Sequence, residues 1–146
     1  MEVETALRSR LISTLRRTFQ AVEAEKGARL RPVGLRAAHY SLMINLAETP
    51  GLSGADLARR LGVTPQNVAI LVARLERNGL LERRTHSRHE HVHELYLTAE
   101  GDRVIAAGDD VVRALEVDIN QVLGAEDAAH LRCLLDRLTD RLSGAG

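Results

Sequence analysis

The chain has 146 residues, a formal net charge of zero and 45% hydrophobic residues, which is typical of one globular domain with a sizeable core. It has no run of about twenty apolar residues and begins with acidic positions, which argues against a membrane-spanning helix and a secretory signal. Its one cysteine, Cys133, cannot form an internal disulfide and lies among leucines. We therefore expect a cytoplasmic protein in which Cys133 is a small buried apolar residue.

The first segment has the pattern of an amphipathic helix. Apolar residues recur there at helical spacing, at Leu7, Leu11, Leu15, Phe19 and Val22. Such a stripe needs a cover, either from the rest of the chain or from a partner.

Two short helices joined by a tight turn are predicted next. Ser53 can cap a first helix over residues 53–61, which Gly62 ends. Thr64 caps the second helix, where Pro65 fits the first position because its missing N–H costs nothing there.

The second of these helices has two distinct faces. Helical spacing places one group of residues in the core: Val68, Leu71, Val72 and Leu75. It leaves another group pointing outward: Gln66, Asn67, Ile70 and Arg74. The outward group is the part that would enter a DNA groove.

After Asn78 and Gly79 the apolar spacing changes towards two. This predicts one strand over residues 81–85 and another that contains Val92, Leu95, Tyr96 and Leu97. The loop between them is almost entirely polar. A polar hairpin directly after a helix-turn-helix is a wing.

Two further amphipathic helices complete the chain. The first is capped by Thr98 and carries a stripe of Val104, Val111, Leu115, Ile119 and Val122. The second carries a stripe of Leu131, Leu134, Leu135, Leu138 and Leu142.

The zero net charge hides an uneven distribution. Residues 53–91 hold seven arginines and four acidic residues, whereas residues 99–146 hold five arginines and ten acidic residues. The basic residues therefore gather where a phosphate backbone would lie, which fits salt-sensitive DNA binding by a protein that acts in two copies.

Three segments resemble the MarR family of bacterial winged helix-turn-helix transcriptional regulators: GLSGADLARRLGVTPQNV, LVARLERNGLLER and LTAEG. The resemblance implies a mainly α fold with a small β-wing. It implies one domain over residues 1–146, with a winged helix-turn-helix core at about 34–98. The helices of about 1–30 and 99–146 would interlock with a second subunit as dimerisation helices.

In such a homodimer, two recognition helices would meet successive major grooves of a pseudo-palindrome, about 34 to 36 Å apart. The residues expected to bind DNA are Ser53, Thr64, Gln66, Asn67, Ile70, Arg74, Arg84, Arg88 and His91. Gln66 and Asn67 suit adenine edges, while Arg74 and Ser53 suit phosphates.

The chain departs from the family at two places in this set. Family members commonly carry a small hydroxyl residue and then arginine where this chain has Ala69 and Ile70. Ile70 either contacts a thymine methyl or makes this protein a weaker binder. Family wings often place an aspartate and an arginine where His89 and His91 stand, so Arg88 or protonated His91 would have to enter the minor groove.

The wing histidines also suggest a metal site. Alternate strand positions project to one face, so His89, His91 and His93 are weak candidates to converge on Zn²⁺ or Cu²⁺. The plainer interpretation is a surface loop that tolerates histidine, since no cysteine or placed carboxylate completes a tetrahedral set. We expect no cofactor.

The resemblance implies a small aromatic or amphipathic effector at the junction of the dimer helices and the winged domain. The candidate lining residues are Arg16, Phe19, Gln20, His39, Tyr40 and Met43. Arg16 or His39 would neutralise a carboxylate and the aromatic rings would stack on the effector. Each of these residues also has an ordinary structural role available in the core or at the surface.

No phosphate-cradling glycine loop, nucleophile with a base motif or helix with paired metal ligands is present, so we expect no enzyme. The sequence favours a ligand-responsive repressor that binds duplex DNA. A metal-responsive regulator that uses the wing histidines is one alternative. A winged-helix scaffold that binds protein without DNA specificity is the other.

Overall fold

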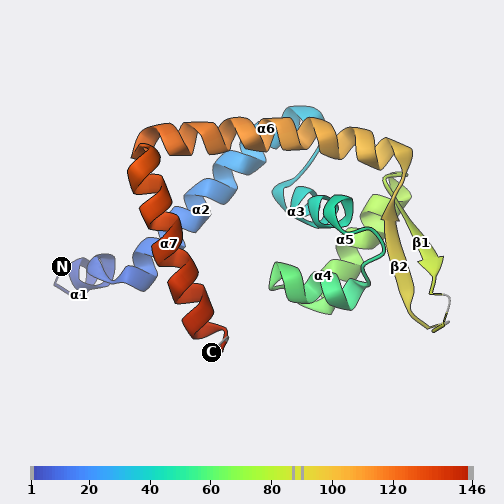
Figure 1. The fold of residues 1–146 in the computed structure, drawn as a ribbon, viewed down its shortest axis with the longest axis horizontal. Coiled ribbons are helices and arrows are strands. Elements are labelled where there is room, and N and C mark those ends of the chain that lie inside the picture. Colours follow the sequence, from blue (N-terminus) through green and yellow to red (C-terminus); the bar gives the residue numbers. More distant parts are fainter. Residues whose placement is uncertain (1, 87, 90, 145–146) are drawn as a thin grey trace. The chain divides into compact units, whose positions relative to one another are not determined.

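The computed structural model describes residues 2–86, 88–89 and 91–144. The elements in chain order are α1 (Glu2–Ser9), α2 (Leu11–Leu30), the 3-10 turn η1 (Arg31–Val33), α3 (Ala37–Glu48), α4 (Gly54–Leu61), α5 (Pro65–Arg77), β1 (Leu81–Thr85), β2 (His93–Leu97), α6 (Ala99–Leu123) and α7 (Ala125–Leu142) (Figure 1). Within these ranges no helix is long and apolar enough to cross a membrane.

The chain divides into two compact units, Met1–Val112 and Arg113–Gly146. The first unit holds the hydrophobic core, to which α3, α4, α5 and both strands contribute. Leu42, Met43 and Leu57 are fully buried in it. The mainly helical fold with a small β-wing is thus confirmed.

The predicted helix-turn-helix is confirmed as α4 and α5. The Ser53 hydroxyl accepts the N–H of Asp56 at 3.1 Å, and the Thr64 hydroxyl accepts the N–H of Asn67 at 3.1 Å. Gly62 ends α4 with a φ of 65°, a left-handed conformation that glycine adopts without steric cost. The caps and the glycine therefore fix where each helix begins and ends.

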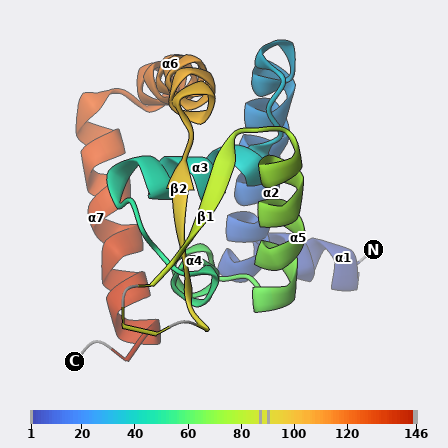
Figure 2. The same ribbon diagram turned by 90° about the vertical axis from the view of Figure 1, so that its right-hand side faces the viewer.

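The wing is an antiparallel hairpin in which Leu81 pairs with Leu97 and Thr85 with His93. Figure 2 shows β1 leaving the end of α5 and running beside β2. The other edge of β2 is also bonded, since Leu95 exchanges hydrogen bonds of 2.9 and 3.0 Å with Gly51 and Leu52. The wing is consequently tied to the segment that leads into α4.

A small cluster of contacts closes the base of the wing. The Thr98 hydroxyl donates to the Gly79 carbonyl at 2.6 Å and accepts the N–H of Gly101 at 3.0 Å. The Thr98 N–H donates to the Leu80 carbonyl at 3.1 Å. Thr98 is the predicted cap of α6, and it also joins the end of α5 to the end of β2.

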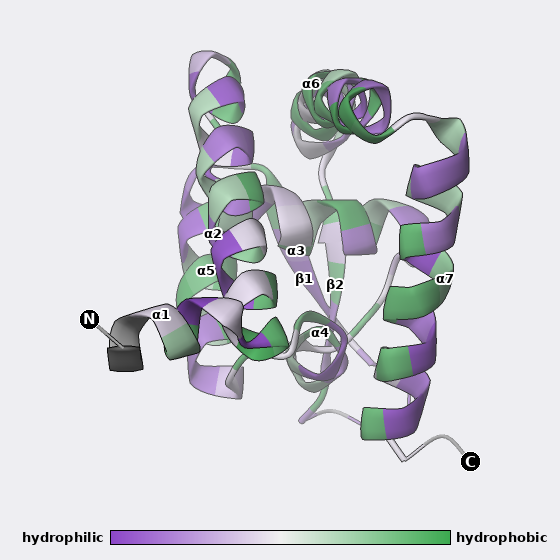
Figure 3. Cartoon of the chain, turned by 90° about the vertical axis from the view of Figure 1, so that its left-hand side faces the viewer, coloured by the Kyte–Doolittle hydropathy of each residue, from purple (hydrophilic) through white to green (hydrophobic). Residues whose placement is uncertain are grey.

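The N-terminal segment differs from the prediction of one helix. It breaks at Arg10 into α1 and α2, and most of its apolar stripe is exposed: Leu11 is 62% and Phe19 66% exposed. Alternating hydrophilic and hydrophobic bands along α2 and α7 are visible in Figure 3.

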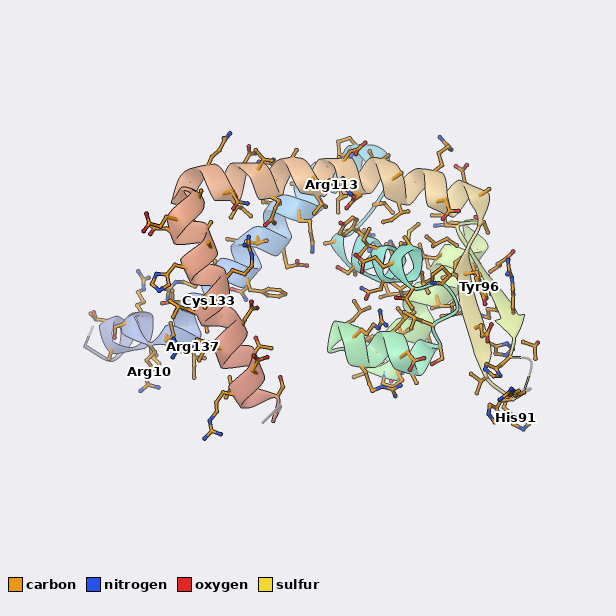
Figure 4. All side chains as sticks on the ribbon, in the orientation of Figure 1. Arg10, His91, Tyr96, Arg113, Cys133 and Arg137 are labelled. Atoms are coloured by element: carbon orange, nitrogen blue, oxygen red, sulfur yellow. The ribbon has the colours of Figure 1, made fainter. Side chains whose placement is uncertain are left out.

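The prediction that Cys133 is buried was wrong. It lies exposed on α7 (Figure 4), together with Leu131, Leu134, Leu135 and Leu138, which are 37–42% exposed. The leucine neighbours were read correctly as a stripe, but the described part of the chain does not cover that stripe. An apolar face is a reliable guide to burial only when the cover belongs to the same chain.

Gly101 is expected to be irreplaceable at the base of the wing. A Cβ at this position would lie 2.1 Å from the Leu80 carbonyl oxygen, so Gly101→Ala forces the backbone apart and should lower the free energy of unfolding by about 3 kcal/mol. Thermal or urea unfolding at fixed protein concentration measures this loss.

Gly27→Ala is the matched control, because Gly27 lies inside α2 and a Cβ there meets no atom within 4 Å. This change should raise stability by about 0.5 to 1 kcal/mol. Equal effects of the two substitutions would show that the contact between Gly101 and Leu80 does not constrain the fold.

Candidate nucleic-acid interface

The outward face of α5 presents the four side chains that the sequence predicted. Gln66, Asn67, Ile70 and Arg74 are all exposed. On the opposite face, Val68, Val72 and Leu75 are at most 3% exposed. The apolar face anchors the helix in the core and leaves the polar face, with Ile70 in it, open to a partner.

The two N-cap residues differ in how free they are to bind a phosphate. The Ser53 hydroxyl already donates to Asp56 Oδ2 at 2.8 Å while its oxygen accepts the Asp56 N–H. The hydroxyl and the backbone N–H of Ser53 both donate to the Asp56 carboxylate, which lowers the pKa of Asp56. The Thr64 oxygen accepts one N–H, which does not use the proton of its hydroxyl. Thr64 is the better placed of the two to donate to DNA.

The two arginines at the base of the wing have acidic partners. Arg83 Nε lies 3.0 Å from Glu76 Oε2 and so links β1 to α5. Arg84 Nη2 lies 2.5 Å from Glu82 Oε1, and its guanidinium sits 4.0 Å from the centre of the Tyr96 ring. Arg84 still keeps 58% of its side chain exposed, so it can face DNA, but as a side chain held against the hairpin.

A short relay of polar groups continues along the hairpin from Tyr96. Its hydroxyl donates to Glu94 Oε2 at 2.7 Å, which raises the pKa of Tyr96. Glu94 Oε1 lies 3.5 Å from His86 Nε2, and His86 Nδ1 accepts the backbone N–H of Arg88 at 3.0 Å. These contacts order the approach to the wing tip.

The histidines at the wing tip are not arranged at the alternate strand positions that the metal hypothesis assumed. The described residues contain no group of three His, Cys, Asp or Glu side chains that could hold an ion. The alternation argument fails because β2 begins only at His93, so His89 and His91 lie in the loop. His89 instead stacks on His86 with ring centres 5.3 Å apart, and His91 lies exposed at the end of the hairpin in Figure 4.

A cavity of about 360 Å³ lies between the start of α4, α5 and the wing. Val68, Val72 and Leu95 line its apolar wall, and Arg83 and His93 are also at its surface. Its size and lining suit a small amphipathic molecule. The six residues predicted to bind an effector are not among those that line it.

Those six residues lie partly on the surface and partly in the core. Arg16, Phe19 and Gln20 are exposed on α2. On α3, Met43 is fully buried and Tyr40 is 8% exposed, with its hydroxyl 2.9 Å from Asp109 Oδ1. Met43 is therefore a core residue, as the alternative interpretation had it. The exposed residues of the predicted effector set are the three on α2.

His39 is a buried histidine at 8% exposure. Burial lowers its pKa below the usual 6.5, and the positive charges of Arg74 and Arg36 lower it further. Arg74 belongs to the outward face of α5, so the charge on that face affects the pKa of His39.

Sequence reasoning missed the partners that hold the interface in place. Asp56 completes a capping box with Ser53, a pattern that the S-x-x-D spacing could have revealed. The ion pair between Glu76 and Arg83 joins two elements, and the sequence alone carries no sign of it.

Comparison with known proteins agrees with this geometry. Residues 33–90 match the model of the MarR family. The HTH-type transcriptional repressor Rv2887 of Mycobacterium tuberculosis is 30% identical over 124 residues, which cover 85% of this chain and 89% of that protein.

Two solved structures extend the similarity to the fold. The transcriptional repressor CouR, bound to a 23-mer DNA duplex, has a TM-score of 0.85 at 25% identity and covers 91% of this chain and 94% of its own. Rv2887 in complex with salicylic acid has a TM-score of 0.72 at 29% identity and covers 89% of this chain and 96% of its own.

His39 should make the stability of the protein depend on pH. Because its pKa is lowered in the folded state, the unfolded chain binds the proton more readily. The contribution of neutral His39 to the free energy of unfolding is fully present above about pH 6.5. It falls as the pH drops below that value, with a slope of at most about 1.4 kcal/mol per pH unit. Urea unfolding between pH 5 and 8 should show a smaller slope for His39→Gln than for the wild type.

His130→Gln is the control, since His130 is exposed on α7. It should leave the slope unchanged. A His39→Gln variant with the wild-type slope would contradict the assignment of this proton to His39.

Proposed function

The chain belongs to the MarR family, and we propose that it is a ligand-responsive, sequence-specific DNA-binding repressor that acts as a homodimer. The observation that carries this proposal is the outward face of α5, where Gln66, Asn67 and, two turns further, Arg74 are exposed on a helix that its opposite face fixes in the core. Amide side chains can pair bidentately with adenine, and a nearby arginine can bind phosphate.

The wing and the caps supply the remaining DNA contacts in this proposal. Thr64 and Ser53 meet the backbone at the two helix starts, while Arg84 lies along the hairpin. Arg88 and His91 approach the minor groove from the tip, where an arginine or a protonated imidazole is favoured by the negative potential.

Homodimerisation is supported by apolar surface that the described part of the chain leaves open. Val122 is 85% and Leu142 82% exposed, and Phe19 on α2 is 66% exposed. A second copy would cover such stripes, and a twofold pair would place its two α5 helices on successive major grooves. The helices of about 1–30 and 99–146 are the proposed dimerisation segments around a winged core of about 34–98.

The proposed effector is a small aromatic acid bound at Arg16, Phe19 and Gln20. Phe19 offers an exposed ring for stacking and Arg16 offers a positive charge. His39 and Tyr40 on α3 are the other polar members of the predicted set, whereas Met43 is buried in the core. The salicylic acid complex of the related Rv2887 makes salicylate a reasonable first probe. An effector acts only through a difference in affinity between the DNA-competent spacing and other spacings of the dimer.

This role requires no catalysis, and the protein would work in the bacterial cytoplasm where its DNA lies. The protein-binding scaffold is the remaining alternative. It would share the fold but would show no sequence preference on DNA at any salt concentration.

Removing the amides of α5 should abolish sequence preference. Fluorescence anisotropy with a duplex selected from the protein's own promoter region should show that Gln66→Ala and Asn67→Ala each weaken binding about 5- to 100-fold. Arg74→Ala should weaken all duplexes alike and reduce the slope of log K against log salt by about one. The complex should contain two chains per duplex.

Gln121→Ala removes an exposed amide outside the proposed DNA interface. Measured at a protein concentration at which both proteins are dimers, it should bind as the wild type does. Equal affinity for selected and scrambled duplexes at every salt concentration would instead support the scaffold.

Salicylate binding should depend on Arg16. Isothermal titration calorimetry on the DNA-free protein should show at least about a tenfold loss of affinity in Arg16→Gln, because a charge-assisted hydrogen bond is lost. Arg17→Gln is the matched control, since the Arg17 guanidinium already donates to Thr14 and to the Arg8 carbonyl.

Arg83→Gln tests the cavity beside the wing, whose lining includes Arg83. Loss of salicylate binding in Arg83→Gln but not in Arg16→Gln would move the effector site to that cavity.

A further inference from the structure

The recognition helix carries an apolar side chain at the centre of its polar face. Ile70 is 61% exposed. At 100° per residue it lies almost opposite the buried Val68, Val72 and Leu75, between Gln66 on one side and Asn67 and Arg74 on the other. Ile70 therefore points away from the core, as does Arg77 two turns further along α5.

This placement matters because helix α5 does not need Ile70 for its own packing. Val68, Val72 and Leu75 already anchor it at 1–3% exposure. Leaving a large aliphatic side chain in water forgoes the stabilisation that burial provides. A partner that covers Ile70 would recover it, and the partner must also satisfy the amides and the guanidinium beside it.

The major groove of DNA meets both requirements. Its base edges offer donors and acceptors to amides, and the C5-methyl group of thymine is the apolar group that unmodified DNA exposes there. We propose that Ile70 reads this methyl group, so that the operator requires a thymine at one fixed position in each half-site, next to the bases contacted by Gln66 and Asn67. The inference rests on the proposed DNA binding and names what this side chain selects.

The test removes only the methyl group. In the selected operator duplex, each thymine in turn is replaced by deoxyuridine, and binding is measured by fluorescence anisotropy for the wild type and Ile70→Ala. At one thymine per half-site, deoxyuridine should weaken wild-type binding about fourfold, the worth of one buried methyl group. Replacing both half-sites together should weaken it about fifteenfold, since distant sites add.

Ile70→Ala should bind more weakly than the wild type and should be insensitive to deoxyuridine at that position. Val63→Ala is the matched control: Val63 is a 39% exposed aliphatic residue just before Thr64, and its loss should leave the deoxyuridine effect intact. If the wild type prefers its operator but binds every deoxyuridine duplex as tightly as the thymine duplex, the role of Ile70 is overturned and the proposed function is not. Failure to prefer any duplex overturns the proposed function together with it.

The same methyl group occurs on 5-methylcytosine. A second selection from a duplex pool that contains both thymine and 5-methylcytosine separates the two sources. Enrichment of thymine at the Ile70 position supports the proposal, and enrichment of 5-methylcytosine over thymine overturns the assignment to thymine.

Discussion

The close approach of Gly101 to the Leu80 carbonyl is the constraint on which the DNA-binding unit depends. It lets Thr98 bond to Gly79, Leu80 and Gly101 at once. The end of α5 and the end of β2 are therefore fixed to each other at one point. Because β2 also bonds to Leu52 on its other edge, the same point sets the position of the cap of α4. The two helices and the wing can then meet DNA as one rigid piece.

Ion pairs orient side chains on this unit but add little to its stability. The arginines of the interface are partly neutralised by neighbours, Arg83 by Glu76 and Arg84 by Glu82. Exposed pairs of this kind contribute little to stability, but they hold long side chains in one orientation. Arg74, Arg77 and Arg88 are also exposed. Because residues 53–91 hold seven arginines and only four acidic residues, a chain with zero net charge can still present a basic surface there.

The sequence predicted the helix caps and the first strand, because interactions between residues close in sequence determine them. Ser53, Thr64 and Thr98 cap helices because a side-chain oxygen can reach the N–H two or three residues ahead, and the strand over residues 81–85 follows from a change of period. It could not predict contacts between distant segments, such as Arg83 with Glu76 or Tyr40 with Asp109. It also failed for Cys133, because an apolar face does not say which chain covers it. The alternation expected for His89, His91 and His93 was wrong, because β2 begins only at His93.

The exposed apolar residues fall into two kinds, and the difference bears on how the protein recognises DNA. On α7 the leucines form a long stripe along the helix, which suits another helix of equal length and chemistry. On α5 a single isoleucine stands among polar groups, which suits a surface where one apolar group is surrounded by donors and acceptors. The first pattern fits the proposed second copy of the chain, and the second fits the proposed contact with a base edge. In the proposed dimer, two Ile70 side chains would face one duplex, so a weak preference at each half-site would be multiplied by the symmetry of the pair.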